Sequence, residues 1–463
     1  MKTKFFYSIF CFLFLIFVPN TFSSKWVVSD GWVLKQNENL NYEKFFAIGT
    51  WGVPGYKFNR LPVREERIKY PSNQKQFLNK IKDFNLFYIQ SEFGKEYMNN
   101  VMKMGGTSEF TWFMEQEYLK ADENHASFYM MKRITKDINS SRLNKVLNTA
   151  IDYTLKEVKD SKDFIWAPFD EAASGVKGWS WPYSLTDAAY KEIKRRTPDK
   201  LVYIDLLGSI SLLGNSFLFQ EQYKKKHGVM PDFPPFYALP KNVTPKKRTL
   251  SDFSVDFYGN SIFNYKNGEP VIKEYEKHTL RTIWFENVKT TANGYKNSGD
   301  IFGINAFQYL YKYPVLAGVT VDAIKAGISK DTPVWVFFDS NGYAKPHNIS
   351  IKDYLENIKC QIYTSIVHGA TGVLFYSELE LSDAVFNQFL PLVKELKSNL
   401  HVIYANTIKQ DVSGDIHYII KQNAIGDRYI IAVNTDTEKS IYFSNSYTTK
   451  SFFQPLEVYI GKL

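Results

Sequence analysis

The feature that most constrains the fold of this chain is a series of eight short apolar runs separated by longer amphipathic stretches. The apolar character of each run is nearly continuous, which is typical of strands buried on both faces, and the intervening stretches have the 3.6-residue period of helices. The alternation predicts an α/β fold in which eight parallel strands close into a (β/α)8 TIM barrel. The runs occupy residues 45–51, 84–93, 108–114, 164–171, 201–208, 252–259, 333–340 and 372–378.

Two parts of the chain depart from this alternation. Residues 260–332 contain the Gly-, Asn- and Lys-rich segment KTTANGYKNSGDIFG, which predicts a loop insertion followed by a helix over 313–327. If the segment instead holds a strand, the numbering of the last strands shifts. After Asn406 the apolar residues recur with period two, which predicts a small antiparallel, β-sandwich-like domain over 406–463 behind a catalytic barrel over 25–405. The early segment KWVVSDGWVLK is a candidate additional strand pair of that small domain.

The first 24 residues have the three zones of a secretory signal peptide: two lysines, a run of Phe, Leu and Ile, and small polar residues. We expect cleavage near Ser23 or Ser24 and a mature protein that is secreted, periplasmic or held at the cell surface, with no stable membrane insertion. An uncleaved anchor is the alternative. Loss of Cys11 with the signal leaves Cys360 without a partner, and its helical surroundings predict a buried, unreactive thiol.

Charge and composition narrow the class of partner. The net charge of +9 comes from basic residues interspersed with acidic ones, so a solvated surface is the simple interpretation and attraction to an acidic polymer the sharper one. No nucleic-acid-binding motif is present, and the seven histidines are too scattered for metal-ligand spacing. We therefore predict no metal, no cofactor and a monomer. Aromatic residues make up 17% of the chain, which favours sugar stacking only slightly.

Carboxylates follow several of the predicted strands. Asp170 and Glu171 come directly after the apolar run FIWAPF, where a barrel strand would reach its carboxyl edge. A helix cap or a salt bridge would also explain this pair. The other predicted strand ends supply more acids and aromatic side chains, and glycoside hydrolysis needs two carboxylates together with faces on which sugar rings can stack. These further residues are Trp51, Glu92, Trp112, Glu115, Asp256, Tyr258, Asp339, Tyr376 and Glu378.

Five of these segments together resemble the secreted (β/α)8 glycoside hydrolases of the clan A type. They are FFAIGTWGVP, DEAASG, DFSVDFYG, TPVWVFFDSNGY and HGATGVLFYSE. The resemblance spans roughly residues 45–400. The resemblance implies that Glu171, at the end of strand four, is the general acid. Asp170 stands where the clan commonly has an Asn that binds the sugar 2-hydroxyl, and its charge would raise the pKa of Glu171.

The resemblance also implies a nucleophile at the end of strand seven, where the clan has Glu and this chain has Asp339. Asp is one methylene shorter, so the retaining geometry is open. The separation of the two carboxyl groups decides the outcome: about 5 Å favours a covalent intermediate, and about 6.5 to 9.5 Å leaves room for a water molecule. The other candidates for the second carboxylate are Asp256, Glu378 and Glu92.

Aromatic residues near the predicted strand ends are the candidate sugar-binding residues. Trp179 and Trp181 follow the paired acids in VKGWSWPYS, where they either stack on sugar or pack over the rim of the barrel. The predicted substrate-binding set is Trp51, Glu92, Trp112, Trp179, Trp181, Asp256, Tyr258, Tyr376 and Glu378.

The sequence thus predicts an exported glycoside hydrolase that cleaves O-glycosidic bonds of an oligosaccharide or polysaccharide with two carboxylates. A non-catalytic carbohydrate-binding barrel is the alternative, and Asp339 in place of Glu is the residue that favours it. Lyase or esterase chemistry is less favoured, because no Ser or His constellation of the required kind is present.

Overall fold

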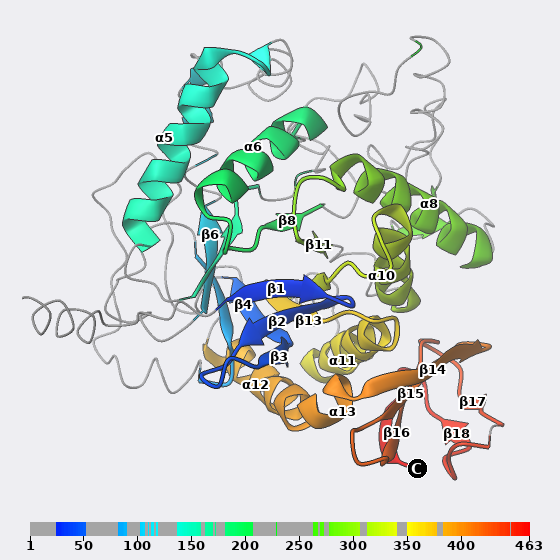
Figure 1. Ribbon diagram of the computed structural model, residues 1–463. Coiled ribbons are helices and arrows are strands. Elements are labelled where there is room, and N and C mark those ends of the chain that lie inside the picture. Colours follow the sequence, from blue (N-terminus) through cyan, green and yellow to red (C-terminus); the bar gives the residue numbers. More distant parts are fainter. Residues whose placement is uncertain are drawn as a thin grey trace, which may run out of the picture.

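The structure is a computed structural model of the chain, and Figure 1 shows its ribbon. The described residues are 25–51, 82–89, 102–106, 137–158, 163–169, 181–206, 277–305, 313–339, 350–376, 383–444 and 446–463, with the short pieces 113–114, 117–118, 263–266 and 269–272 and the single residues 110, 172 and 228.

An eight-stranded sheet lies at the centre of the molecule, in the order β7-β6-β5-β4-β13-β12-β11-β8. Every neighbouring pair of strands is parallel. A parallel bridge between Trp166 of β7 and Val202, beside β8, joins the two ends of this order. The strands are β4 (Ala47–Trp51), β5 (Leu86–Ile89), β6 (Met102–Gly106), β7 (Phe164–Ala167), β8 (Tyr203–Asp205), β11 (Ile301–Asn305), β12 (Val334–Asp339) and β13 (Gly372–Tyr376).

The α/β class and the parallel sheet are confirmed, and six of the eight predicted runs contain a strand of this sheet. The prediction for 108–114 is wrong, because Phe110, Phe113 and Met114 are helical. The third strand of the sheet along the chain is β6. It lies between the predicted runs at 84–93 and 108–114, in a stretch that the spacing of its apolar residues had predicted to be helical. The predicted run at 252–259 lies outside the described residues, and β11 occupies the sixth position along the chain.

Helices follow the strands and lie around the sheet in Figure 1, with α5 and α6 on the side of β6 and α10 and α11 on the side of β13. Their bounds are α5 (Ser141–Val158), α6 (Tyr183–Arg196), α8 (Lys277–Tyr295), α10 (Val315–Gly327), α11 (Ile351–Val367), α12 (Asp383–Ser398) and α13 (Leu400–Tyr404). The predicted helix over 313–327 is confirmed as α10. The predicted loop before it is wrong, because its first residues continue α8 and its last ones enter β11.

Alternation along the strands divides the apolar core in two. On one face of the sheet, here called the inner face, Leu86, Tyr203 and Trp335 belong to one compact cluster. On the outer face, alternate residues such as Ile204 and Val336 join the larger cluster formed with the helices. Both faces of the strands are therefore buried, which explains why their sequences are continuously apolar.

Small residues on the inner face leave space for large ones. A Cβ on Gly372 would lie 2.5 Å from the Trp335 ring and 2.8 Å from Ala47, and a Cβ on Gly303 would overlap the Tyr203 ring. Trp335 and Tyr203 stack with their centroids 5.8 Å apart. Close packing of the interior thus depends on pairing bulky side chains with glycine on neighbouring strands.

A three-stranded antiparallel sheet, formed by β1 (Trp26–Ser29), β2 (Trp32–Gln36) and β3 (Tyr42–Phe45), packs against the inner cluster. The Trp26 indole N–H and the Lys35 ammonium both donate to the Asp163 carboxylate just before β7, at 3.2 and 2.7 Å. Among the described strands this segment forms a sheet of its own. The possibility that it joins the C-terminal β strands is therefore wrong.

The C-terminal residues form an antiparallel sheet in the order β14-β15-β16-β19. Its strands are β14 (Asn406–Ser413), β15 (Ile416–Gln422), β16 (Arg428–Asn434) and β19 (Val458–Lys462). Two short hairpins complete the described strands: β17 (Ile441–Tyr442) with β18 (Phe452–Phe453), and β9 (Phe263–Lys266) with β10 (Glu269–Ile272).

Helix α11 lies between the parallel sheet and the C-terminal sheet. The serine before it, Ser350, accepts a hydrogen bond from the Asp353 amide and caps the helix. Nearly every residue of its second half is buried. Cys360 lies in this half, its Sγ is 3.5 Å from the Asn434 carbonyl oxygen, and burial raises the pKa of its thiol to about 12, so the prediction of a buried thiol is confirmed.

We expect Gly372→Ala to lower the free energy of unfolding by about 1 to 3 kcal/mol, because the new methyl group overpacks the space beside Trp335. Urea unfolding of the single and double variants tests this. In the Gly372→Ala/Trp335→Leu double variant the loss should be smaller than the sum of the two single losses. Additive losses would show that the methyl group and the indole do not compete for the same space.

Candidate active site

Three of the predicted site residues end adjacent strands of the parallel sheet. Asp339 ends β12, Tyr376 ends β13 and Trp51 ends β4. The ladder pairs Asp339 with Tyr376 and Tyr376 with Trp51. The structure therefore brings together, at one edge, residues that are up to 325 positions apart in the sequence (376 − 51). This is the carboxyl edge, where parallel α/β sheets carry their functional residues.

Most of the other predicted site residues lie outside the described residues. These are Glu92, Trp112, Asp170, Glu171, Trp179, Asp256, Tyr258 and Glu378. Their assignments stay predictions. Asp256 and Tyr258 were predicted from the end of a sixth strand over 252–259, which lies outside the described residues, and among the described strands of the sheet β11 is the sixth along the chain.

Asp205 is a functional candidate that the sequence analysis missed. It is the last residue of β8 and is wholly buried. Its position two residues after Tyr203 places it on the inner face of the sheet. A carboxylate costs free energy to bury, so Asp205 at the carboxyl end of a strand indicates a role other than apolar packing.

The signal for Asp205 was present in the sequence. It follows the apolar run LVYI directly, just as Asp170 follows FIWAPF. The leucines after it made the run appear to continue to Gly208. The strand instead ends at Asp205, so its carboxyl terminus comes three residues earlier than predicted.

Backbone hydrogen bonds connect the end of β8 to the segment after β7. The Ala172 amide, in the residue that follows Glu171 along the chain, donates to the Asp205 carbonyl oxygen at 2.7 Å. The Trp181 amide in turn donates to the Ala172 carbonyl oxygen at 2.8 Å. Ala172 and Trp181 are thus joined by a backbone hydrogen bond.

Tyr295 on α8 also bonds to the backbone of both Ala172 and Trp181. Its hydroxyl lies 2.6 Å from the Ala172 carbonyl oxygen and 2.7 Å from that of Trp181, and it donates to this pair of acceptors. The Tyr295 ring also packs edge-on against Tyr183 on α6, with centroids 4.6 Å apart. A residue more than a hundred positions along the chain therefore fixes both ends of the segment that follows the predicted catalytic pair.

The prediction that Trp181 stacks on sugar is wrong. Its side chain is 2% exposed and packs against Phe169, with ring centroids 5.1 Å apart. Trp181 lies two residues before α6, and its side chain belongs to the larger apolar cluster formed by the sheet and the helices. Packing at the rim was the alternative for this residue, and it is the one observed.

The described residues do not supply a metal centre. Among them, no group of three or more His, Cys, Asp or Glu side chains is placed to hold a metal ion. Within the same part of the chain, no helix has the length and hydropathy needed to cross a membrane.

No protein-family model matches the chain, and no curated protein matches it in sequence. Solved structures that resemble it are glycoside hydrolases. A family 39 glycoside hydrolase from Bacteroides cellulosilyticus is 10% identical with a TM-score of 0.38, and the match covers 90% of this chain and 80% of the other. An α-amylase from Anoxybacillus is 8% identical with a TM-score of 0.40, and the match covers 83% of this chain and 86% of the other. A maltogenic amylase from S. marinus is 10% identical with a TM-score of 0.41, and the match covers 92% of this chain and 71% of the other. TM-scores this low assign neither a family nor an activity to the chain.

We expect Trp181→Ala to lower the free energy of unfolding by about 3 to 5 kcal/mol, because it removes a buried indole from the core. Trp181→Phe keeps an aromatic ring against Phe169 and should cost less. Denaturant unfolding of both variants measures the difference. An unchanged midpoint for Trp181→Ala would mean that the side chain is not part of the packed core.

We expect Tyr295→Phe to lower the free energy of unfolding by about 1 to 3 kcal/mol, because a buried carbonyl oxygen loses its donor while the ring packing is kept. Hydrogen exchange of the Trp181 amide should become faster at the same time. Tyr190→Phe is the matched control, since that hydroxyl donates to Asp300, away from Ala172. Faster Trp181 exchange in the control as well would argue against a local effect of Tyr295.

Proposed function

We propose that the chain is a glycoside hydrolase that cleaves O-glycosidic bonds of an oligosaccharide or polysaccharide. The observation that carries the proposal is the pairing of Asp339, Tyr376 and Trp51 at the carboxyl edge of the parallel sheet. Carboxylates supply acid, base or nucleophile for glycosyl transfer, and aromatic residues supply faces for sugar rings. Asp205 adds a buried carboxylate at the end of a further strand of the same sheet.

In this proposal Glu171 is the general acid and base. The residue that follows it along the chain, Ala172, donates from its backbone amide to the Asp205 carbonyl oxygen at 2.7 Å. Asp170, the residue before Glu171, would raise the pKa of Glu171 and keep it protonated for transfer to the leaving oxygen. Asp339 is the first candidate for the second carboxylate, and Asp205 joins Asp256, Glu378 and Glu92 as alternatives.

The proposal includes a complete (β/α)8 barrel. The bridge between Trp166 and Val202 supports closure, as does the hydrogen bond from the Trp166 amide to the Leu201 carbonyl oxygen at 2.9 Å. Closure would bring all eight carboxyl ends around one opening. We also propose export through residues 1–24, cleavage of that segment, and action as a monomer on a carbohydrate outside the cytoplasm.

A non-catalytic carbohydrate-binding protein of the same fold is the second candidate. The residue that favours it is Asp339, which stands where the glycoside hydrolases that the sequence resembles have Glu. Such a protein would keep the aromatic residues of the carboxyl edge and bind sugar without hydrolysis. Measuring both binding and release of reducing sugar on the same glycans separates the two functions.

We expect Glu171→Gln to lower kcat/KM by about 10² to 10⁴ on a glycan with a poor leaving group, because protonation of that leaving group is lost. The loss should be smaller on an aryl glycoside whose phenolate leaves without a proton. The measurement is initial rates on a panel of aryl glycosides and of plant, algal and host glycans. Glu356→Gln, an exposed Glu→Gln change on α11, is the matched control and should leave the rates unchanged.

Two results would count against the catalytic proposal. The first is sugar binding without any hydrolysis by the unaltered protein, which favours the second candidate. The second is equal rates for Glu171→Gln and the unaltered protein on every hydrolysed substrate, which would remove Glu171 from the mechanism.

A further inference from the structure

Three side chains form a hydrogen-bonded line where the C-terminal sheet meets the helices. His368, just after α11, has its Nδ1 2.7 Å from the Asp322 carboxylate on α10. Its other ring nitrogen, Nε2, lies 2.7 Å from Nδ1 of His417 on β15. We call these three residues the histidine line. It directly connects the parallel-sheet part of the chain with the C-terminal sheet.

The line is built into the packing of this contact. Both imidazoles are buried, and their ring centroids are 5.0 Å apart. A Cβ on Gly318 of α10 would lie 2.4 Å from the His368 ring, so only glycine leaves space for the imidazole there. The histidines therefore hold fixed positions relative to each other.

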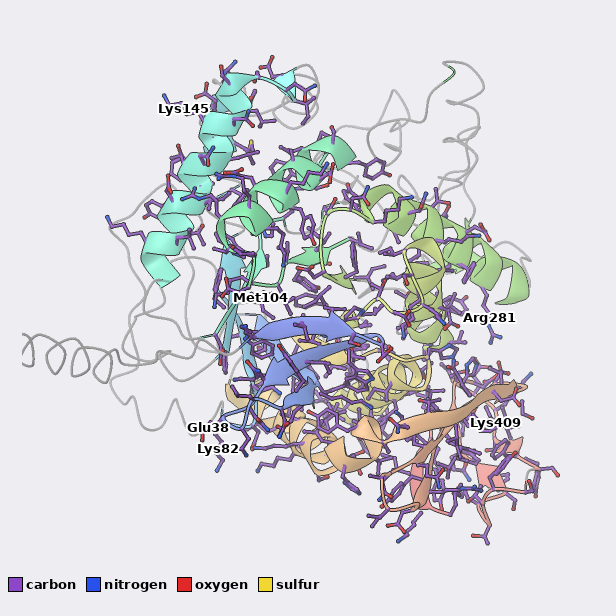
Figure 2. The ribbon with its side chains drawn as sticks, in the orientation of Figure 1. Glu38, Lys82, Met104, Lys145, Arg281 and Lys409 are labelled. Atoms are coloured by element: carbon purple, nitrogen blue, oxygen red, sulfur yellow. The ribbon has the colours of Figure 1, made fainter. Side chains whose placement is uncertain are left out.

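Other charged groups lie on α8, on α10 and on or just before β15. Arg281 on α8 pairs with Asp415, just before β15, at 2.8 Å, and Figure 2 shows Arg281 on the side of its helix that faces the C-terminal sheet. Lys325 on α10 is mostly buried, and its pKa is lowered by that burial. Lys421, further along β15, donates to two carbonyl oxygens at the end of α13, those of Ile403 and Ala405.

The bond between the two histidines needs one proton between His368 Nε2 and His417 Nδ1. In the first arrangement both rings are neutral: His368 donates from Nδ1 to Asp322, and His417 donates from Nδ1 to His368 Nε2. In the second, one proton has been added, so His368 donates from both nitrogens and His417 accepts at Nδ1. Both arrangements keep both hydrogen bonds.

A second added proton breaks the line. With both rings charged, N–H groups on His368 Nε2 and His417 Nδ1 would point at each other across 2.7 Å. Two buried positive charges would also repel each other, with Arg281 adding to the repulsion. The docked line therefore excludes the state in which both rings are charged.

We propose that the histidine line is an acid-sensitive latch that holds the C-terminal sheet against α10 and α11. Because the docked pair excludes the state with both rings charged and separated histidines do not, acid favours the separated state. The latch opens when β15 moves away from His368, which gives His417 room to be protonated. The substrate and the chemistry of the candidate active site play no part in this inference.

The pKa of His417 decides the direction in which pH changes the stability of the docked state and the pH range of that change. Burial, the charge of His368 and the charge of Arg281 lower the pKa of His417 well below its ordinary value of 6.5. Below about pH 6.5, His417 in the opened chain binds a proton that His417 in the docked chain does not bind, so the stability of the docked state falls as the pH falls. Burial lowers the pKa of Lys421 to about 7, and its contribution changes between there and 10.5, outside the acid range.

The test compares His417→Asn with the unaltered protein. Asn places an amide near the position of Nδ1, and this amide can donate to His368 or accept from it but does not titrate. Between about pH 6.5 and 5, the unfolding equilibrium constant of the unaltered protein should rise about tenfold per pH unit relative to that of the variant. His401→Asn is the matched control, because His401 is an exposed histidine on α13, and its profile should follow the unaltered protein.

Hydrogen exchange tests the latch itself. At pH 5 relative to pH 7, after correction for intrinsic rates, the amides of β15 should lose protection before those of α5. If β15 and α5 open together, or if His417→Asn has the same pH profile as the unaltered protein, the latch is wrong.

A measurement on the unaltered protein tests the proposal even if His417→Asn does not fold. Exchange of the imidazole C2 hydrogen, followed by mass spectrometry of histidine-containing peptides, reports the titration of His417 directly. A midpoint well below 6.5 supports the proposal, and a midpoint at 6.5 overturns it.

Discussion

The burial of the parallel strands on both faces is the constraint on which the rest of the structure depends. Helices cover one face, and the other face holds the cluster around Trp335 and Tyr203. That cluster fits only because Gly372 and Gly303 leave space on the neighbouring strands. Since every strand must supply the right volume at the right register, the order of the strands and the positions of their carboxyl ends are fixed together.

Helix α11 extends this constraint to the C-terminal sheet. A helix buried on one side needs one apolar stripe, whereas α11 is buried over most of its second half because it is covered by a sheet on either side. Polar groups on the buried half of α11 therefore lose their contact with water as well. Cys360 and Thr364 bond to backbone or to each other, and His368 Nε2 bonds to His417 Nδ1 across the contact. The other nitrogen of His417, Nε2, is buried and has no hydrogen-bond partner among the described residues. The histidine line thus lies where a buried histidine of β15 docks beside the end of a buried helix.

Much of this fold could be predicted from the sequence, because strands buried on both faces leave continuous apolar runs, as in PVWVFFD before Asp339. The exceptions have different causes. Strand β6 lies in a stretch whose apolar residues have a helical period. Strand β11, with the sequence IFGIN, contains a glycine that resembles a turn signal, yet Gly303 is small because the Tyr203 ring occupies the space beside it. Such a requirement comes from another strand. Periodicity within one segment cannot reveal it.

The same distinction separates the parts of the site that the sequence could and could not predict. A residue at the end of an apolar run, such as Asp339 or Tyr376, can be placed at the carboxyl edge from local pattern alone. The burial of Trp181 depends on Phe169, and its backbone carbonyl oxygen is bound by Tyr295 from a distant helix. Tyr295 lies within what the sequence presented as a loop insertion. A site on a parallel sheet therefore has two layers: the residues that strand ends display, which local sequence indicates, and the contacts that hold the connecting segments, which only the assembled fold creates.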